Sequence, residues 1–323
     1  MYSIDRYTTG DDLAASLRDD VATGLAASPK WLPPKWFYDE RGSTLFERIT
    51  ELDVYYPTRR EWEILHRCAR EIARVTRAQT LVELGSGSSR KTRALLDALS
   101  HLDTLQGYVP VDVSEAALVG AADGLRPDYR DLDIHPVVAD FEHHVDLLPR
   151  DGRRLIAFLG GTVGNLDPMQ RAKFFAAVRA SMDSGDSLLL GTDLVKDPAR
   201  LVAAYDDPQG VTAEFNRNVL RVINRELEAD FDVEAFDHVA LWNADEERIE
   251  MWLRASRAMR VNIAGLPLQV EFVTGEQMRT ELSAKFTETR VRDELDLAGL
   301  RLMRWWTDKR ADFALSLAIP ADC

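Results

Sequence analysis

The sequence has little cysteine, a shortage of positive charge and no long apolar run, and each shortage excludes a class of protein. Only Cys68 and Cys323 are cysteines among 323 residues, so a disulfide framework is excluded. The 40 basic residues against 54 acidic ones give a net charge of −14, which repels the phosphate backbone of nucleic acids. The longest apolar candidate, residues 155–166, is broken by glycines and is shorter than the roughly 18 residues of a membrane helix. We therefore expect neither a nucleic-acid partner nor a membrane span.

The remaining composition is typical of a folded globular protein. Apolar residues make up 46% of the chain and charged residues 29%. The polar N-terminal stretch, followed by Asp11 and Asp12, does not resemble a signal peptide, so we expect a cytoplasmic protein and a monomer. The six histidines show no metal-ligand spacing, and we predict no metal site.

From residue 80 onward, short β-type runs alternate with helix-type runs. The pattern predicts strands at 80–84, 108–111, 134–138, 155–159 and 187–190, with helices at 90–102, 115–125 and 168–182. Alternating strands and helices predict a parallel sheet with right-handed crossovers, the doubly wound α/β class.

This alternation stops after Lys196. Residues 201–227 indicate an interrupted helix, residues 236–254 and 261–272 indicate strand pairs, and the tail predicts a helix at 291–300 and strands at 301–307 and 313–319. We therefore expect two domains. The doubly wound domain would comprise 57–196 and 286–323, and an α+β substrate-binding domain would comprise 1–56 and 197–285.

The first chemical signal is a glycine loop, Gly85-Ser86-Gly87, between a predicted strand and a predicted helix. Glycines allow a tight turn and close approach of a ligand to the unpaired N–H groups of a helix N-terminus. Acidic residues end the next two strands, with Asp112 after the second and Asp140-Phe141 after the third. Ligands of doubly wound folds bind at these strand ends, where carboxylates suit ribose hydroxyls and an exocyclic amino group. Each acid alone is as readily a helix cap or a turn residue.

This set of residues resembles the class I S-adenosylmethionine-dependent methyltransferases, which have a Rossmann-like fold. The resemblance implies that Gly85 and Gly87 hold the amino-acid part of the cofactor and that Asp112 binds its ribose. It also implies that Asp140 and Phe141 bind adenine. No third glycine of a dinucleotide fingerprint is present at Ser89, although a dehydrogenase or a catalytically silent nucleotide-binding module remains the competing class.

A more specific resemblance extends over about residues 13–319. The chain resembles the histidine-specific Nα-methyltransferases of ergothioneine biosynthesis. The resemblance lies in the segments 33–39, 42–47, 55–59, 160–166, 191–196 and 215–218. The last of these segments is Phe215-Asn216-Arg217-Asn218. The resemblance implies trimethylation of the α-amine of free L-histidine to hercynine, with S-adenosylmethionine as the methyl donor. A methyltransferase for another small amine or amino acid is the alternative.

The same resemblance implies roles for individual residues. Those expected to bind the amino-acid end of histidine are Tyr55, Asn165 and Tyr205, with Tyr38 near the amine, so that Tyr38 and Tyr55 are the catalytic candidates. Glu281 and Ser283 would bind the imidazole, and Lys91 would lie on the cofactor side.

The chemistry of Glu281 and Ser283 agrees with an imidazole site. They are two residues apart, so on an extended segment their side chains lie on the same face. A carboxylate accepts a ring N–H, and a hydroxyl donates to or accepts from the other ring nitrogen. The alternative for Glu281 is a solvated face of a strand.

Overall fold

The computed structural model describes residues 3–87, 89 and 91–321, and the chain divides into two compact units. Unit 1 comprises Met1–Thr9, Pro57–Val195 and Phe286–Cys323, and unit 2 comprises Gly10–Tyr56 and Lys196–Lys285. Two boundaries differ from the predicted domains, because residues 1–9 group with unit 1 and Lys196 groups with unit 2. The N-terminal segment joins unit 1 because β1 (Asp5–Arg6) pairs in parallel with β6 (Val137–Val138).

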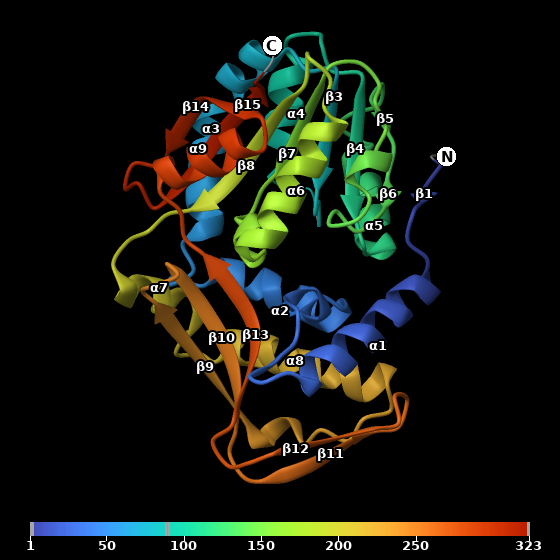
Figure 1. Cartoon of the computed structure of the whole chain (residues 1–323). Helices are drawn as coiled ribbons and strands as arrows, with labels where there is room; N and C mark the ends of the chain where they lie inside the picture. The colour runs from blue at the N-terminus through green and yellow to red at the C-terminus, as the bar shows by residue number, and fades with distance from the viewer. Residues whose placement is uncertain (1–2, 88, 90, 322–323) are drawn as a thin grey trace. The chain divides into compact units, whose positions relative to one another are not determined.

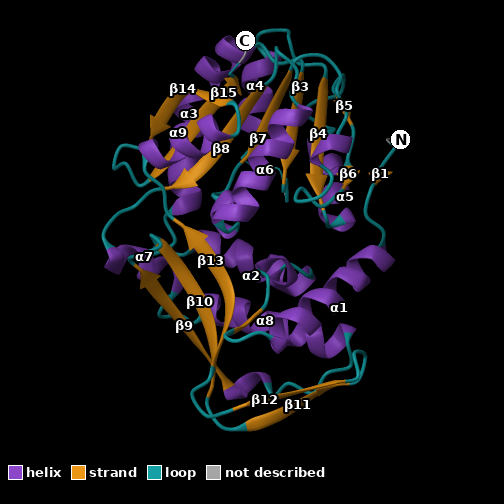
Figure 2. Ribbon diagram, viewed as in Figure 1, coloured by secondary structure: helices purple, strands orange, loops and turns teal. Residues whose placement is uncertain are grey.

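Unit 1 is built on a sheet with the strand order β1-β6-β4-β3-β7-β8-β15-β14 (Figures 1 and 2). Its other strands are β3 (Thr80–Leu84), β4 (Gly107–Asp112), β5 (Asp133–Ile134, beside β4), β7 (Arg154–Phe158), β8 (Ser187–Asp193), β14 (Leu300–Thr307) and β15 (Phe313–Pro320). β3, β4, β7 and β8 are mutually parallel, and β15 is antiparallel to both β8 and β14. The predicted doubly wound α/β class is confirmed.

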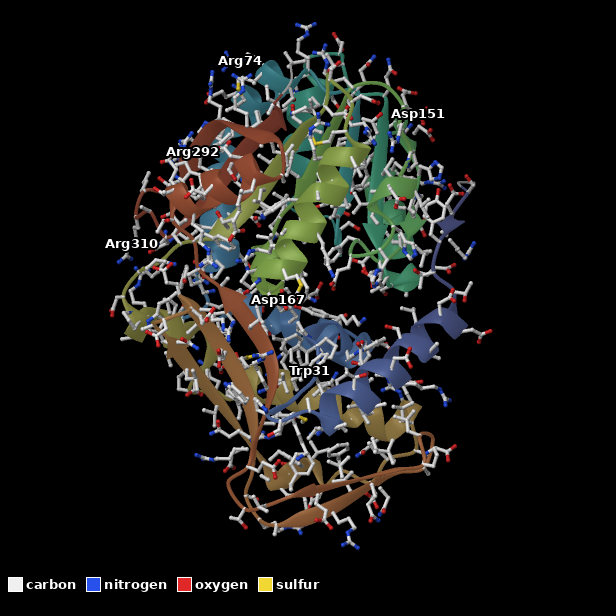
Figure 3. The ribbon with its side chains drawn as sticks, viewed as in Figure 1. Trp31, Arg74, Asp151, Asp167, Arg292 and Arg310 are labelled. Carbon is white, nitrogen blue, oxygen red and sulfur yellow. The ribbon has the colours of Figure 1, made fainter. Side chains whose placement is uncertain are left out.

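Helices cover both faces of this sheet (Figure 1). One face packs against α3 (Pro57–Thr76), α4 (Arg93–Ser100) and α5 (Glu115–Leu125) through a shared apolar core. The other face carries α6 (Pro168–Ser181) and α9 (Glu288–Leu297), with the short turns η2 (Val145–Leu147) and η3 (Thr162–Asn165) nearby in the chain. Asp167, labelled in Figure 3, begins α6 with a capping box in which its carboxylate accepts from the Gln170 N–H.

Unit 2 has its own sheet, in the order β2-β13-β10-β9, and a separate antiparallel ribbon. The strands are β2 (Lys30–Trp31), β9 (Phe236–Asn243), β10 (Arg248–Ala255) and β13 (Gln277–Ala284), with β11 (Met259–Ile263) and β12 (Leu268–Phe272) in the ribbon. The helices are α1 (Gly10–Ala26), η1 (Pro34–Phe37), α2 (Glu40–Glu51), α7 (Pro198–Tyr205), α8 (Val211–Glu226) and η4 (Val233–Ala235). One apolar core joins these elements except β2 and η4, and Val233 of η4 packs against it.

Two details of unit 2 go beyond the predicted elements. The interrupted helix expected at 201–227 is two helices, because Gly210 has a φ of +72° and the Asp207 carboxylate accepts the first N–H groups of α8. The register of β13 against β10 shifts at Thr280, so a β-bulge precedes Glu281.

Charged side chains lie on the outside of unit 1, as Arg74, Asp151, Arg292 and Arg310 illustrate (Figure 3). Among the described residues, no helix is long and apolar enough to cross a membrane.

Candidate active site

The glycine loop follows β3 and leaves open space beside its backbone. Gly85 and Gly87 have φ angles of +65° and +48°, and a Cβ added to either would meet no atom within 4 Å. The Gly87 N–H donates to Oδ2 of Asp112 at 3.0 Å, which fastens the loop to the end of β4. The Ser86 hydroxyl is buried and has no hydrogen-bond partner among the described residues. The loop therefore combines open space beside its two glycines with a buried hydroxyl that has no partner in the described part of the chain, and buried polar groups normally have one.

The acids predicted to bind a nucleoside lie at neighbouring strand ends. Asp112 ends β4, and its Oδ1 also accepts the Ser114 N–H at 2.9 Å. Burial raises the pKa of Asp112 above its ordinary value, outweighing the hydrogen bonds from the backbone. Asp140 and Phe141 follow β6, which lies beside β4, and the Phe141 ring packs against Phe158 with 4.9 Å between centroids. The structure thus places the glycine loop, Asp112 and Asp140-Phe141 together at the carboxyl ends of neighbouring strands.

Lys91 is held by a residue that the sequence analysis missed. Its Nζ lies 2.5 Å from Oε2 of Glu61, a fully buried carboxylate on α3. Oε1 of Glu61 accepts the Gly160 N–H at 2.7 Å. Glu61 thereby ties Lys91 to the end of β7. The sequence contains a signal that could have revealed this buried glutamate. Glu61 lies on the same face of the helix as the apolar residues Ile64, Leu65 and Cys68.

A buried network holds the other end of the glycine loop. Glu83 accepts hydrogen bonds from Thr92 and from the Tyr108 hydroxyl, which lies 2.5 Å from Oε2. The same hydroxyl lies 2.7 Å from Oγ of Ser89, a residue with a φ of +52°. Burial raises the pKa of Glu83 to about 7, although both hydrogen bonds oppose the shift. The network fixes the strained turn at Ser89 and so the start of α4.

In unit 2, the three predicted tyrosines belong to one chain of contacting rings. Tyr38 meets Phe46 with 5.5 Å between centroids, Phe46 meets Tyr55 at 6.2 Å, and Tyr55 meets Tyr205 at 6.4 Å. All three contacts are edge-to-face, the preferred geometry of aromatic pairs. Phe46, whose role the sequence did not reveal, connects the two tyrosines proposed as catalytic.

The register of β13 puts Glu281 and Ser283 on one face, as predicted. Glu281 lies opposite Met251 and Ser283 opposite Ile249, two residues of the buried face of β10. Oγ of Ser283 is 2.8 Å from the hydroxyl of Tyr205, although the two residues were expected to bind opposite ends of histidine.

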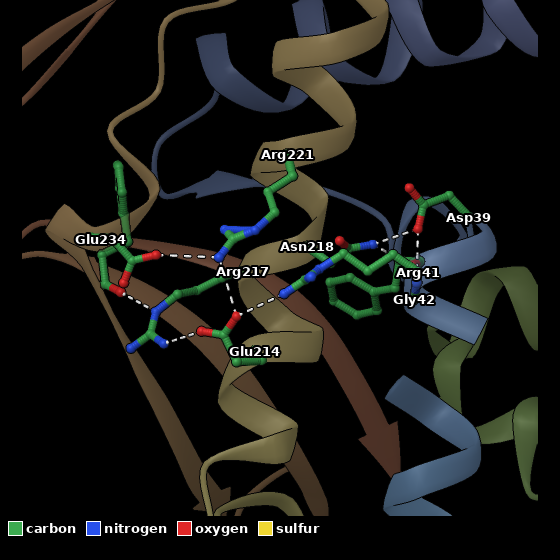
Figure 4. Close-up of polar contacts among 10 residues, drawn as sticks. Asp39, Arg41, Gly42, Glu214, Arg217, Asn218, Arg221 and Glu234 are labelled. Carbon is green, nitrogen blue, oxygen red and sulfur yellow. Dashed lines mark hydrogen bonds and ion pairs between the residues drawn. The ribbon is translucent and has the colours of Figure 1, made fainter. Parts of the chain in front are cut away.

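The motif Phe215-Asn216-Arg217-Asn218 on α8 anchors the segment around Tyr38. Nδ2 of Asn218 donates to Oδ1 of Asp39 at 2.7 Å (Figure 4). The same carboxylate caps α2 by accepting the Gly42 N–H at 2.8 Å. Burial by itself would raise the pKa of Asp39, but hydrogen bonds from Gly42, Arg225 and Asn218 hold it below its ordinary value. The neighbouring ion pairs of Glu214 with Arg41, Arg217 and Arg221 further fix α8 (Figure 4).

Asn216 connects the β-bulge to Tyr205. Oδ1 of Asn216 accepts from the Thr280 hydroxyl at 2.6 Å, and Nδ2 lies 2.8 Å from Nδ1 of His238. Nε2 of His238 lies 2.8 Å from the carbonyl oxygen of Tyr205, so Nε2 carries the proton and Nδ1 accepts. Burial lowers the pKa of His238, which keeps the ring neutral in this arrangement.

Asn165 ends η3 in unit 1, whereas Tyr38, Tyr55, Tyr205, Glu281 and Ser283 belong to unit 2. In the described part of the chain, no group of three or more His, Cys, Asp or Glu side chains could hold a metal ion.

Comparison with known families decides the assignment. A model of the family described as "Histidine-specific methyltransferase, SAM-dependent" matches residues 17–320. The chain belongs to this family. It is 59% identical over 303 residues to a histidine N-alpha-methyltransferase of Mycobacterium tuberculosis, covering 94% of each chain. It is 55% identical over 317 residues to a protein of the same name from Mycolicibacterium smegmatis, covering 98% of this chain and 99% of the relative.

A more distant relative carries a different name. The chain is 30% identical over 290 residues to ergothioneine biosynthesis protein 1 of Neurospora crassa, covering 86% of this chain and 32% of that protein. Family membership also gives the cofactor, S-adenosylmethionine. The open glycine cradle, the unsatisfied Ser86 hydroxyl and the carboxylate of Asp112 fit this group.

Proposed function

We propose that the chain transfers methyl groups from S-adenosylmethionine to the α-amine of free L-histidine three times, giving hercynine, as the first step of ergothioneine biosynthesis. The observation that carries the proposal is the shared face of Glu281 and Ser283, with the Tyr205 hydroxyl 2.8 Å from Ser283. A carboxylate and a hydroxyl on one face suit the two nitrogens of an imidazole. The names of the two mycobacterial relatives support the same substrate.

The residues that we propose to hold the cofactor all belong to unit 1. Gly85, Ser86 and Gly87 would hold the amino-acid part of S-adenosylmethionine, and the ammonium of Lys91 would pair with its carboxylate. Asp112 would accept the ribose hydroxyls, because a carboxylate oxygen that accepts one N–H keeps a further lone pair. Phe141 would stack on adenine beside Asp140. Bound in this way, the cofactor supplies an activated methyl group on a sulfonium sulfur.

The amine is held by unit 2 residues whose hydroxyls accept its hydrogens. An α-amine with a pKa of roughly 8 is partly neutral at physiological pH, so a strong base is not required. The hydroxyls of Tyr38 and Tyr55 would orient the lone pair of the nitrogen toward the methyl group. Each added methyl increases the bulk of the nitrogen, and the third makes it permanently cationic. The ring faces of this aromatic chain would attract that cation by about 0.5–2 kcal/mol. For Asn165, contact with the amino-acid end of histidine stays a prediction.

Mass spectrometry of histidine incubated with the enzyme and S-adenosylmethionine tests the proposal. We expect products heavier by one, two and three methyl groups, with every methyl on the α-nitrogen. A methyl on a ring nitrogen, or arrest after the first transfer, would contradict it. Parallel incubations with other small amines and amino acids test the alternative substrate class. The expected cytoplasmic location and monomeric state stay predictions.

A further inference from the structure

The side chain of His144 closes the turn that carries Asp140 and Phe141, the two residues proposed to bind adenine. The backbone N–H of Asp140 donates to Nδ1 of His144 at 3.2 Å. The carbonyl oxygen of Asp140 accepts the backbone N–H groups of His143 and His144 at 3.0 and 2.9 Å. Oδ1 of Asp140 accepts the Glu142 N–H at 2.8 Å. The backbone and the carboxylate of Asp140 are therefore both held from within the turn.

These contacts determine which nitrogen of His144 accepts. A ring nitrogen that accepts an N–H needs a free lone pair, so Nδ1 is unprotonated and Nε2 carries the proton of the neutral ring. The Thr8 hydroxyl lies 3.3 Å from the same Nδ1, and it can only donate to an unprotonated nitrogen. The lone pair of Nδ1 is thus shared by the Asp140 N–H and the Thr8 hydroxyl. A side chain without an acceptor at this position would leave the Asp140 N–H without its partner.

The N-terminal segment brings Thr8 to this ring. β1 pairs in parallel with β6, and just beyond β1 the Tyr7 N–H donates to the Val138 carbonyl oxygen at 2.9 Å. Val138 ends β6, the strand that leads into the turn. Thr8 is buried, and the ring centroids of Tyr7 and His144 are 6.5 Å apart. The segment therefore follows β6 and reaches the turn at His144.

We propose that His144 is a positioning residue for the adenine end of S-adenosylmethionine, because its Nδ1 holds the turn in which the Asp140 carboxylate meets the exocyclic amino group. A carboxylate keeps further lone pairs after it accepts the Glu142 N–H, and the amino group has two hydrogens to donate. The Phe141 ring, next in the chain, packs against Phe158 with 4.9 Å between centroids. This inference rests on the proposed function, because it takes Asp140 and Phe141 as the adenine site.

The preference for adenine over hypoxanthine reports the position of the Asp140 carboxylate. S-Adenosylhomocysteine carries adenine, and S-inosylhomocysteine has an oxygen in place of the exocyclic amino group. That oxygen offers a lone pair to a carboxylate that also has only lone pairs. A correctly placed Asp140 should therefore favour S-adenosylhomocysteine by about tenfold or more. A displaced turn should lose this preference, whereas a general loosening of the site weakens both ligands and leaves the ratio of their Kd values unchanged.

Calorimetric titration of both ligands into the wild type, His144→Leu and His144→Asn tests the inference. Leucine has no acceptor, so the ratio of the two Kd values should fall by about tenfold in His144→Leu. Asparagine carries Oδ1 as many bonds from its Cα as Nδ1 is in histidine, so His144→Asn should keep most of the wild-type ratio. His143→Leu is the matched control, because His143 is an exposed residue of the same turn that bonds Asp140 through its backbone N–H. The control should keep the wild-type ratio.

Two results of this titration would overturn the inference. One is a wild-type ratio in His144→Leu, which would mean that the turn holds the carboxylate without the ring. The other is an equal loss in His144→Leu and His144→Asn, which would mean that the acceptor at this position is irrelevant. His144→Gln replaces the leucine variant if that protein does not fold. Its amide oxygen stands at the position of Nε2 and not of Nδ1, so the ratio should fall in the same way.

Two variants outside His144 complete the test. Thr8→Val keeps the shape of the side chain but removes its hydroxyl, and it should lower the ratio by about two- to fivefold. Asp140→Ala separates the inference from the proposed function. If Asp140→Ala keeps the wild-type ratio, Asp140 does not bind the amino group and the proposed adenine site is rejected. If Asp140→Ala loses the ratio and His144→Leu keeps it, the adenine site stands and only the role of His144 is rejected.

Discussion

Nδ2 of Asn218 donates to Oδ1 of Asp39 at 2.7 Å and to the carbonyl oxygen of Phe37 at 3.1 Å. The two acceptors lie on either side of Tyr38 in the chain, so one amide fixes the backbone before and after this tyrosine. Gly42 completes the arrangement, because a Cβ there would lie 1.6 Å from the Phe37 carbonyl oxygen. The position of the Tyr38 ring is therefore set by a residue of α8.

Asn218→Ala should reduce the methylation activity by more than its loss of folding stability explains. The loss of a hydrogen bond to a carboxylate costs about 1.5–3 kcal/mol, and a displaced Tyr38 should lower kcat/KM for histidine by about tenfold or more. Asn224→Ala is the matched control, since Asn224 also lies on α8 and donates to a backbone carbonyl, that of Phe231, at 2.9 Å. Urea unfolding and steady-state kinetics of both variants separate the two effects. Equal losses of activity in the two variants would show that Asn218 does not position Tyr38.

The buried Glu83 predicts a pH dependence of stability. Its pKa rises from 4.5 to about 7 on folding, so between these values the folded state holds a proton that the unfolded state has released. Stability contributed at Glu83 is therefore lost as the pH rises through this window. Glu83→Gln removes that loss, and its stability relative to the wild type should improve by about 2–3 kcal/mol from pH 5 to pH 8.

Urea unfolding of the cofactor-free proteins at the two pH values measures this difference. Glu115→Gln is the control, because a hydrogen bond from Arg6 keeps the pKa of Glu115 below its ordinary value, and that carboxylate stays ionised throughout the range. A stability difference between Glu83→Gln and the wild type that does not change with pH would mean that Glu83 is ionised in the folded protein.

Asp112→Ala should weaken the binding of S-adenosylmethionine. A hydrogen bond to a charged group contributes about 1.5–3 kcal/mol, which corresponds to a roughly 10- to 150-fold increase in Kd. The variant also frees the Gly87 N–H, so the glycine loop should loosen as well. Calorimetry measures the affinity, with Asp151→Ala as an exposed control. An unchanged affinity in a folded Asp112→Ala protein would reject the ribose assignment.

Glu281→Ala should change the choice of substrate. Removing the carboxylate should lower kcat/KM for histidine by roughly 10- to 150-fold, and it should relieve the bias against phenylalanine, which has no N–H to pair with Glu281. Ser283→Ala should act in the same direction but more weakly, because a neutral hydrogen bond contributes about 0.5–1.5 kcal/mol. Glu271→Ala, an exposed glutamate on β12, is the control. If Glu281→Ala keeps the wild-type ratio of kcat/KM for histidine to kcat/KM for phenylalanine, another residue recognises the imidazole ring.

The sequence predicted the sheet of unit 1 better than the details of unit 2. Buried parallel strands such as β3 and β7 are mainly apolar runs, which a pattern reveals directly, although β3 contains Glu83. The bulge at Thr280 arises from tertiary contacts with Asn216 and the Met251 carbonyl oxygen, and no local signal encodes it. The sequence indicated an interrupted helix at 201–227, but it did not indicate that two separate helices form on either side of Gly210.

The same distinction holds for the candidate site. Asp112 and Asp140 follow strands and were found by position alone, whereas Glu281 and Tyr205 depended on the family resemblance. Lys285, which follows β13, escaped notice because a lysine reads as a solvated residue, and only the structure reveals that it is buried with its Nζ 3.0 Å from the Tyr205 hydroxyl. The asparagines of α8 belong to a motif, but their partners lie far away in the chain.

The position of β15 between β8 and β14 has a consequence for synthesis on the ribosome. The apolar strand β8 emerges with β7 on one side and no neighbour on the other until β15 is made. At roughly 5–20 residues per second, the interval of about 120 residues lasts about 6–24 s. During that time β8 presents an open strand edge, which favours pairing with other chains. Protection of the nascent chain from aggregation therefore depends on the arrival of the last hairpin.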